Sequence, residues 1–244
     1  MRKYGLLACL IVLTSCAYLE PLVQDINIVS VAQEKEIGEK FEAEIAKEMK
    51  VVQNSAANNR VNAIGQKLIS GLPSRDFDYR FHVIEDNTPN AFTIPGGIIY
   101  VHTGLIQFVS DDSELAGVIG HELGHAYQRH PDKGLSRAYG VDYLSKLIFG
   151  GTEGQIKTLT LELAKGGILS KYSRQDEYEA DEVGYFLIKK AGYSTSGLLR
   201  FLKKIMNLEK GGSTLPFLSS HPPTPDRIAR LESFETRTPT STFS

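Results

Sequence analysis

Charged and apolar positions repeat with a helical period along most of the chain. Between residues 31 and 50, apolar side chains recur at every fourth position among charges, which predicts an amphipathic helix with one buried stripe. The same pattern returns over residues 59–72, where Gly71 and Pro73 mark its end. Further helices are predicted at residues 112–129, 136–149, 155–169, 174–191, 196–208 and 225–234.

Two stretches follow the period of a strand instead. From residue 78 to residue 84 the side chains of Tyr79, Phe81 and Val83 lie on one side, as in a half-buried strand. A β-branched run over residues 97–101, entered through Pro95 and Gly96, predicts a second strand. Together these two strands predict a small sheet among the helices.

The N-terminal segment differs from the rest of the chain. Arg2 and Lys3 precede an apolar run over residues 5–13, which is too short to span a bilayer and is typical of a signal peptide. Residues 13–16 read Leu-Thr-Ser-Cys and resemble a bacterial lipobox, which predicts cleavage after residue 15 and a lipid on Cys16. The alternative is an ordinary secretory cleavage site with an incidental cysteine. After cleavage Cys16 would be the only cysteine, which leaves no structural disulfide.

Length and charge narrow the class of protein. A chain of 244 residues, 41% hydrophobic and 23% charged, fits one globular domain. We divide it into a signal peptide (residues 1–15), a lipid-anchored segment (16–29), a folded domain (30–235) and a frayed tail (236–244). Without Arg2 and Lys3 the chain has 25 basic and 29 acidic residues, so its charge gives no reason to expect nucleic acid as a partner. Beyond the leader, no apolar run reaches the ~18 residues of a spanning helix.

One motif in the predicted helix at residues 112–129 carries catalytic chemistry. It reads His121-Glu122-Leu123-Gly124-His125, and at ~100° per residue its two histidines lie about 40° apart on one helix face. Both imidazoles could therefore bind one zinc ion. Glu122 projects beside them, where it could take a proton from a water whose pKa zinc lowers to about 7.

A catalytic zinc ion needs a third protein ligand, and spacing favours one candidate. His130 lies roughly 140° around the helix from His125, so it cannot join the pair unless the helix breaks. Glu177 and Asp181 share one face of a later predicted helix. Glu177 is the expected ligand, and Asp181 could accept a hydrogen bond from the outer nitrogen of a ligand histidine. The alternative is a solvated acidic helix.

His221 is a further candidate for the site. Pro222 and Pro223 follow it directly, which predicts a stiff loop that leads into the last helix. Its imidazole could cap the zinc in a resting state or line the cleft beside it. The alternative is a structural histidine hydrogen-bonded near Arg227.

Several separate segments together resemble the gluzincin metallopeptidases of the HtpX-like and CAAX-prenyl-protease-like type. They are HELGH (residues 121–125), EYEAD (177–181), NAFTIPGG (90–97), YVHTGL (100–105) and SHPPTPDRI (220–228). The resemblance implies a zincin-type α+β fold, zinc on His121, His125 and Glu177, and Glu122 as catalytic base. It also implies an edge strand beside the active-site cleft, to which a peptide substrate adds as a further strand. The residues of that edge strand are Asn90, Ala91, Phe92, Gly96 and Gly97.

The chain lacks the spanning helices of some members of that type and the helical-repeat domain of others, so it resembles the short lipoprotein members. We expect a metalloendopeptidase with one Zn²⁺ per chain, held to a lipid bilayer through Cys16, facing the periplasm and acting on unfolded or misassembled envelope proteins. Ala17, rather than aspartate, follows Cys16 and favours the outer membrane.

Two other functions use the same residues. A zinc-binding assembly chaperone with little turnover would not need Glu122, because zinc binding requires only the ligands. A peptidoglycan or small-amide hydrolase would not need the extended strand predicted over residues 90–97.

Overall fold

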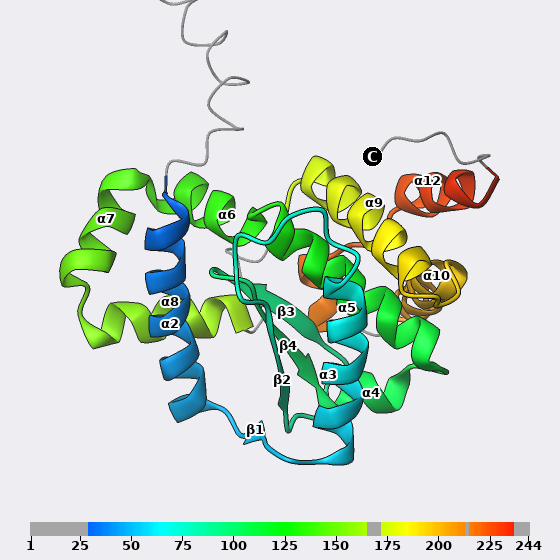
Figure 1. Ribbon diagram of the computed structural model, residues 1–244, viewed down its shortest axis with the longest axis horizontal. Helices are drawn as coiled ribbons and strands as arrows, with labels where there is room; N and C mark the ends of the chain where they lie inside the picture. The colour runs from blue at the N-terminus through cyan, green and yellow to red at the C-terminus, as the bar shows by residue number, and fades with distance from the viewer. Residues whose placement is uncertain (1–28, 165–171, 213–214, 237–244) are drawn as a thin grey trace, which may run out of the picture.

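The computed structural model describes residues 29–164, 172–212 and 215–236 (Figure 1). The predicted signal peptide, Cys16 and the tail beyond residue 236 lie outside these ranges. Within them, the chain is mostly helical with one small sheet, which confirms the α+β prediction. The elements are α2 (Val31–Glu48), β1 (Val51–Val52), α3 (Ala56–Ile69), β2 (Arg80–Ile84), β3 (Ala91–Ile94), β4 (Ile98–His102), α4 (Thr103–Phe108), α5 (Asp112–Tyr127), α6 (His130–Tyr139), α7 (Val141–Gly150), α8 (Glu153–Ala164), α9 (Arg174–Lys190), α10 (Ser196–Lys210), α11 (Pro216–Ser220) and α12 (Pro225–Thr236).

The four-stranded sheet has the order β1-β2-β4-β3. β2 and β4 pair in parallel, with Val83 opposite Val101, whereas β1 and β3 pair antiparallel to their neighbours. β3 is therefore an edge strand. The sheet lies between α2 and α8 on one side and α3 and α5 on the other (Figure 1).

Side chains on both faces of the sheet are buried. Along β4, Ile99 and Val101 join the cluster that includes α3, α5, α9 and α10, while Ile98 and Tyr100 join the cluster with α2, α7 and α8. A strand that is buried on both faces carries an unbroken apolar run rather than an alternating one. Each fully buried aliphatic side chain contributes about 1.5–3 kcal/mol to stability.

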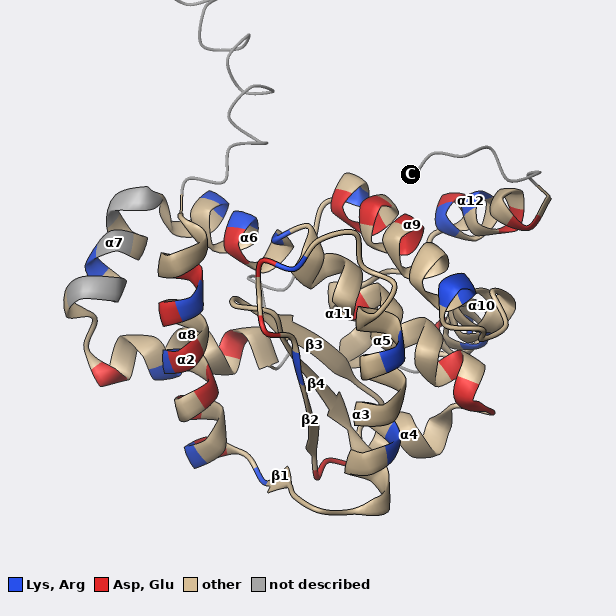
Figure 2. Cartoon of the chain, viewed as in Figure 1, with Lys and Arg blue, Asp and Glu red and all other residues tan. Residues whose placement is uncertain are grey.

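Charged residues gather on the helices, and few lie on the strands (Figure 2). Lys47 of α2 contacts Glu153, and Lys157 of α8 contacts Glu48, which ties α2 and α8 together along an exposed seam. Among the described helices, we find none that combines the length and the apolar character needed to cross a bilayer.

Most predicted helices are present, but one prediction is wrong. Residues 136–149 do not form a single helix, because α6 ends at Tyr139 and α7 begins at Val141. Gly140 between them has a φ of 74°, a left-handed conformation that breaks a helix and that glycine adopts without strain. The short elements β1, α4 and α11 were not predicted, because they are too short to show a period.

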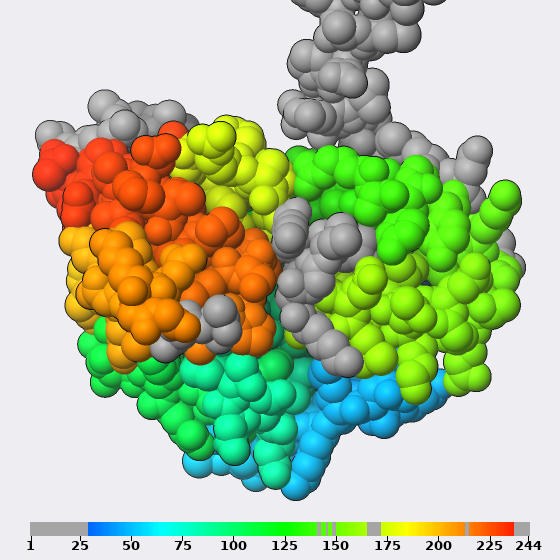
Figure 3. All heavy atoms as spheres, turned by 180° about the vertical axis from the view of Figure 1, so that it is seen from behind, coloured from blue at the N-terminus to red at the C-terminus, as the bar shows by residue number. Residues whose placement is uncertain are grey.

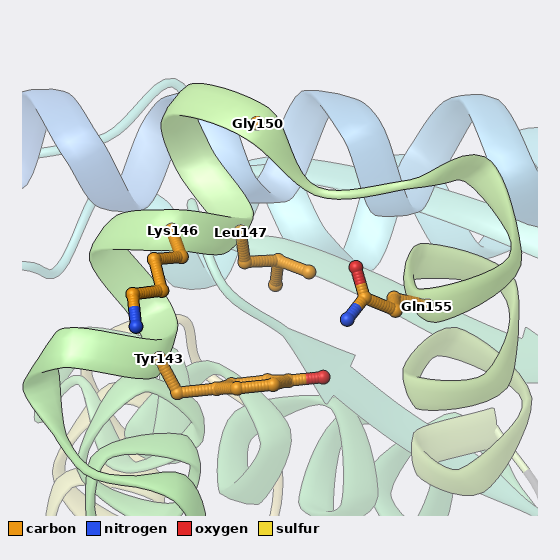
Figure 4. A pocket seen from close by; sticks show the side chains of 5 residues that line it. All are labelled: Tyr143, Lys146, Leu147, Gly150 and Gln155. Atoms are coloured by element: carbon orange, nitrogen blue, oxygen red, sulfur yellow. The ribbon is translucent and has the colours of Figure 1, made fainter.

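The covering helices form two groups around the sheet. Figure 3 shows the molecule from behind, with α10 to α12 on one side, α6 to α8 on the other and the N-terminal helices below. A pocket of about 470 Å³ lies on the α7–α8 side, lined by Tyr143, Lys146, Leu147, Gly150 and Gln155 (Figure 4).

Candidate metal centre

Helices α5 and α9 cross beside the edge strand at very close range. A Cβ atom at Gly124 of α5 would lie 2.6 Å from the carbonyl oxygen of Ala180 in α9, so only glycine permits this approach. α9 begins at a fixed place because the Ser173 hydroxyl accepts from the backbone N–H of Asp176, whose carboxylate accepts from the N–H of Ser173. The first turn of α9 is thereby held against the middle of α5.

Four buried side chains converge at this crossing, namely His121, His125, Glu177 and His221, and their potential ligand atoms all lie within 4.8 Å of one another. The Nε2 atoms of His121 and His125 are 3.0 Å apart. Glu177 places Oε1 3.3 Å from Nε2 of His125 and Oε2 3.5 Å from Nε2 of His121. The structure therefore brings together the three residues that the sequence analysis put forward as ligands.

A second layer of charged groups surrounds this cluster. Nδ1 of His121, on the side away from the cluster, lies 2.9 Å from Oδ1 of Asp181. Asp181 also accepts hydrogen bonds from Nε and Nη2 of Arg227, at 2.8 Å each. Nη1 of Arg227 lies 2.5 Å from Oε2 of Glu177. One buried guanidinium therefore contacts the carboxylates of both Glu177 and Asp181.

Glu122 is buried with its two carboxylate oxygens in different surroundings. The hydroxyl of Thr93 on β3 lies 2.7 Å from Oε2 and 3.0 Å from the backbone carbonyl oxygen of Glu122. Oε1 has no hydrogen-bond partner among the described residues and lies 3.4 Å from Nε2 of His221. The edge strand thus fixes one oxygen and leaves the other available beside the cluster.

The charge balance of the cluster favours a divalent cation. Burial by itself raises the pKa of Glu177, but the charges of Arg227 and His221 outweigh it and hold that pKa well below its ordinary value. The pKa of Asp181 is lowered in the same way, because Arg227 outweighs the effect of burial. A metal ion would bind the histidines as neutral imidazoles, and the buried carboxylates of Glu122, Glu177 and Asp181 would then face one guanidinium, which leaves two negative charges for the metal to balance. Two imidazoles and a carboxylate form a common donor set of catalytic zinc.

The sequence that builds this centre matches a known pattern. Residues 55–235, which include the whole cluster, match Peptidase family M48. The chain belongs to this peptidase family. Metalloprotease YcaL of Escherichia coli is 31% identical over 181 residues, which cover 73% of this chain and 70% of that protein.

Two other relatives are longer. Beta-barrel assembly-enhancing protease of Escherichia coli is 27% identical over 218 residues, and these cover 83% of this chain but 44% of that protein. Mitochondrial metalloendopeptidase OMA1 of Schizosaccharomyces pombe is 30% identical over 176 residues, 70% of this chain and 51% of that protein. The present chain spans about half the length of these two relatives. Membership of family M48 makes it a zinc metalloendopeptidase that acts on polypeptides.

The strand that was expected to border the cleft is shorter than predicted. Ala91 and Phe92 lie in β3, Asn90 immediately precedes it, and Gly96 and Gly97 lie in the turn to β4. The whole of β3 is buried, and Nδ2 of Asn90 donates to the carbonyl oxygen of Ala164 at the end of α8 at 3.4 Å. β3 is the edge strand of the sheet, yet all of its residues are buried in this structure.

His221 follows α11 directly, in the short segment that leads into α12, and it is almost fully buried. Its Nδ1 atom lies 3.0 Å from Oε1 of Glu177 and 3.2 Å from Nε2 of His121. The imidazole therefore reaches the same point as the expected ligands. This position is compatible with a cap on the metal and with a residue that lines the cleft, and Arg227 also lies nearby, where its Nη1 donates to the carbonyl oxygen of Pro222 at 3.1 Å.

Three residues that contact this site were not predicted from the sequence. Arg227 and Thr93 hold carboxylates, and the ring of Tyr172 stacks on that of His125, with centroids 3.9 Å apart and an angle of 23°. Arg227 alone gave a signal, because it lies four positions before Leu231 on the apolar face of α12. Thr93 and Tyr172 follow no pattern that distinguishes them from ordinary strand and loop residues.

Proposed function

We propose that His121, His125 and Glu177 hold the zinc ion and that Glu122 is the general base of peptide-bond hydrolysis. When bound, zinc supplies a Lewis acid that polarises the scissile carbonyl and acidifies water. Glu122 accepts the proton of the attacking water at Oε1 and returns it to the departing amine nitrogen. The observation that carries this proposal is the unpartnered Oε1 of Glu122 beside the cluster, with Oε2 held by Thr93.

Asp181 and Arg227 keep the proposed ligands in their binding states. The carboxylate of Asp181 lies 2.9 Å from Nδ1 of His121, and its negative charge favours a proton on that nitrogen, which leaves Nε2 able to bind metal. Arg227 keeps Asp181 and Glu177 ionised, since its fixed positive charge opposes the effect of burial.

The substrate adds to β3 as an antiparallel or parallel strand. His102 N–H donates to the Asn90 carbonyl oxygen, so the register of β3 and β4 points the backbone groups of Ala91 and Thr93 toward the open edge. Because Thr93 also contacts Glu122, a strand added beside Thr93 would bring its scissile bond near the base. Because Asn90 bonds to Ala164, the peptide has to displace the end of α8.

His221 would be a further residue to hold the metal ion in the resting enzyme, where its imidazole would compete with substrate. We expect His221→Ala to lower the Michaelis constant for casein several-fold, since the substrate no longer competes with an imidazole. A fall in turnover at an unchanged Michaelis constant would instead assign His221 to transition-state stabilisation beside the cleft. Steady-state kinetics separate the two, with His82→Ala, remote from the cluster, as the control. Wild-type values for both constants would eliminate both roles.

The chain is a member of the short lipoprotein type, anchored through Cys16 and facing the periplasm, with the outer membrane favoured. The proposal rests on the lipobox at residues 13–16 and on relatives that include a protease named for enhancing β-barrel assembly. Its substrates are unfolded or misassembled envelope proteins, since an added strand is recognised mainly through its backbone.

Replacing Cys16 with serine tests the anchor. The Cys16→Ser protein is expected to appear in the soluble periplasmic fraction or to remain as an uncut precursor, because the thiol that receives the lipid is absent. Cell fractionation and mass spectrometry of the N-terminus measure this. A Cys9→Ser protein is the control, because Cys9 lies inside the predicted leader. Normal processing with full membrane retention of Cys16→Ser would count against lipidation.

The substrates can be found by comparing envelope proteomes. A strain without the gene and a strain that carries Glu122→Gln should accumulate the same envelope proteins, because both lack hydrolysis. If the Glu122→Gln strain has a wild-type envelope proteome while the deletion strain does not, the chain acts by binding and the hydrolytic role is refuted.

A further inference from the structure

His130 is fully buried beside the four candidate ligands of the metal centre but is not one of them. On an unbroken helix it would lie roughly 140° away from His125. In the structure α5 ends at Tyr127, and a separate helix, α6, begins at His130 (Figure 1). The break therefore decides where the imidazole of His130 points.

The break between α5 and α6 is stabilised by contacts with the N-terminal part of the described chain. Arg129 has a φ of 58°, in the left-handed region that non-glycine residues rarely adopt. Its Nε donates to Oε2 of Glu34 at 2.6 Å, and its Nη2 donates to the carbonyl oxygen of Val29 at 2.6 Å. Such a conformation persists only where the surroundings fix it. These contacts turn His130 back toward α5.

The turn brings the outer nitrogens of two imidazoles together. Nδ1 of His130 lies 2.9 Å from Nδ1 of His125, and the two rings meet at an angle of 71°. The other nitrogen of His125, Nε2, faces His121 and Glu177. On its far side, His130 places Nε2 3.2 Å from Oε2 of Glu179. A continuous chain thus runs from the cluster through two imidazoles to a carboxylate.

Only one set of tautomers satisfies this chain when His125 binds metal. A metal on Nε2 of His125 requires its proton to be on Nδ1. Nδ1 of His130 must then accept, so the proton of His130 is on Nε2 and is donated to Glu179. Glu179 in turn accepts from Nε2 of Gln175 at 2.8 Å, which fixes the carboxylate. With these tautomers, each N–H along the chain has an acceptor.

The two histidines of the HExxH motif therefore have different outer partners. His121 faces the carboxylate of Asp181 directly, whereas His125 reaches the carboxylate of Glu179 through an intervening imidazole. We propose that His130 is a positioning residue, which fixes the tautomer and ring orientation of His125 so that Nε2 is presented to the zinc ion. This inference rests on the proposed role of His125 as a ligand.

The affinity of the purified protein for zinc tests the proposal, measured by competition with a chromophoric chelator. His130→Leu removes the acceptor but fills the space, and we expect zinc binding to weaken about 10–100-fold. His130→Asn keeps an acceptor near the place of Nδ1 and is expected to restore most of the lost affinity. His82→Leu is the matched control, because His82 also contacts a carboxylate, that of Glu42 at 2.8 Å, and it is not in the cluster. Its zinc affinity should equal that of the wild type.

Thermal unfolding with and without zinc separates positioning from packing. If His130 only packs, His130→Leu lowers the melting temperatures of both forms equally and leaves zinc affinity unchanged, which overturns the proposal. Should His130→Leu fail to fold, Glu179→Ala carries the test, because Glu179 lies at the helix surface. It should weaken zinc binding in the same direction by a smaller factor, and wild-type affinity in this variant would overturn the proposal.

Failure of the zinc site itself gives a different result. If the wild type binds no zinc, or if His125→Ala binds zinc as tightly as the wild type, the proposed function is refuted. If the wild type binds one zinc ion and His130→Leu binds it equally well, only the role of His130 is refuted.

Discussion

Replacing Glu122 with glutamine is expected to leave the fold and the bound zinc intact and to lower kcat/KM for casein by about 10²–10⁴-fold. The side chain keeps its shape, so its oxygen can still accept the hydrogen bond from Thr93. Its amide nitrogen then occupies the place of Oε1 and cannot accept a proton from water. Every proposed metal ligand remains.

The control for this substitution lies on the same helix. Glu114 is also buried on α5, where it accepts from the backbone N–H of Ser110 at 2.8 Å, and it is not in the metal cluster. Glu114→Gln should therefore keep wild-type proteolysis. Comparable hydrolysis by Glu122→Gln and the wild type, with equal zinc content, would refute the assignment of the base.

Replacing Arg227 with methionine should destabilise the protein by about 3–5 kcal/mol, because it leaves two buried carboxylates without their partner. Arg227 is 1% exposed, and it bonds to both oxygens of Asp181 and contacts Glu177. Methionine retains much of the volume of the side chain, so the lost charge rather than a cavity should dominate. Urea unfolding of the zinc-free proteins measures the change without a contribution from metal binding.

Arg230→Met is the matched control, one turn further along α12. Arg230 pairs with Glu182 at 3.0 Å, but both side chains are exposed. Exposed ion pairs contribute about 0–1 kcal/mol, so this variant should unfold close to the wild type. Equal destabilisation by the two substitutions would contradict the view that Arg227 acts through its buried charge.

The proposed metal ligands could be picked out from the sequence because each signal is local. His121 and His125 share a face through helical spacing alone, and so do Glu177 and Asp181. These two helix faces meet where α5 and α9 cross. The residues that fix them in place were not predictable in this way, because their contacts join distant parts of the chain.

The end of α5 is an example of a feature that local sequence patterns do not predict. Periodicity continued the helix to residue 129, and the structure ends it at Tyr127 because Glu34, 95 positions before Arg129, holds that arginine in a left-handed conformation. No local pattern reports such a contact. The position of His130 follows from it, and so does the partner of His125.

The contacts of the edge strand were likewise not predictable from local sequence patterns. The sequence indicated a strand near residues 90–97, but it did not show that this strand is buried or that Asn90 bonds to Ala164 at the end of α8. Thr93 likewise looks like an ordinary strand residue until β3 is placed against α5.

Zinc content and proteolysis, measured on the same purified samples of the wild type, Glu177→Ala and Glu182→Ala, test the central claim most directly. Glu182 is also on α9 but is exposed and is not in the metal cluster. We predict one zinc ion per chain and casein hydrolysis in the wild type and in Glu182→Ala, and neither in Glu177→Ala. Equal zinc content in all three proteins, or hydrolysis that persists after zinc is removed, would contradict the account.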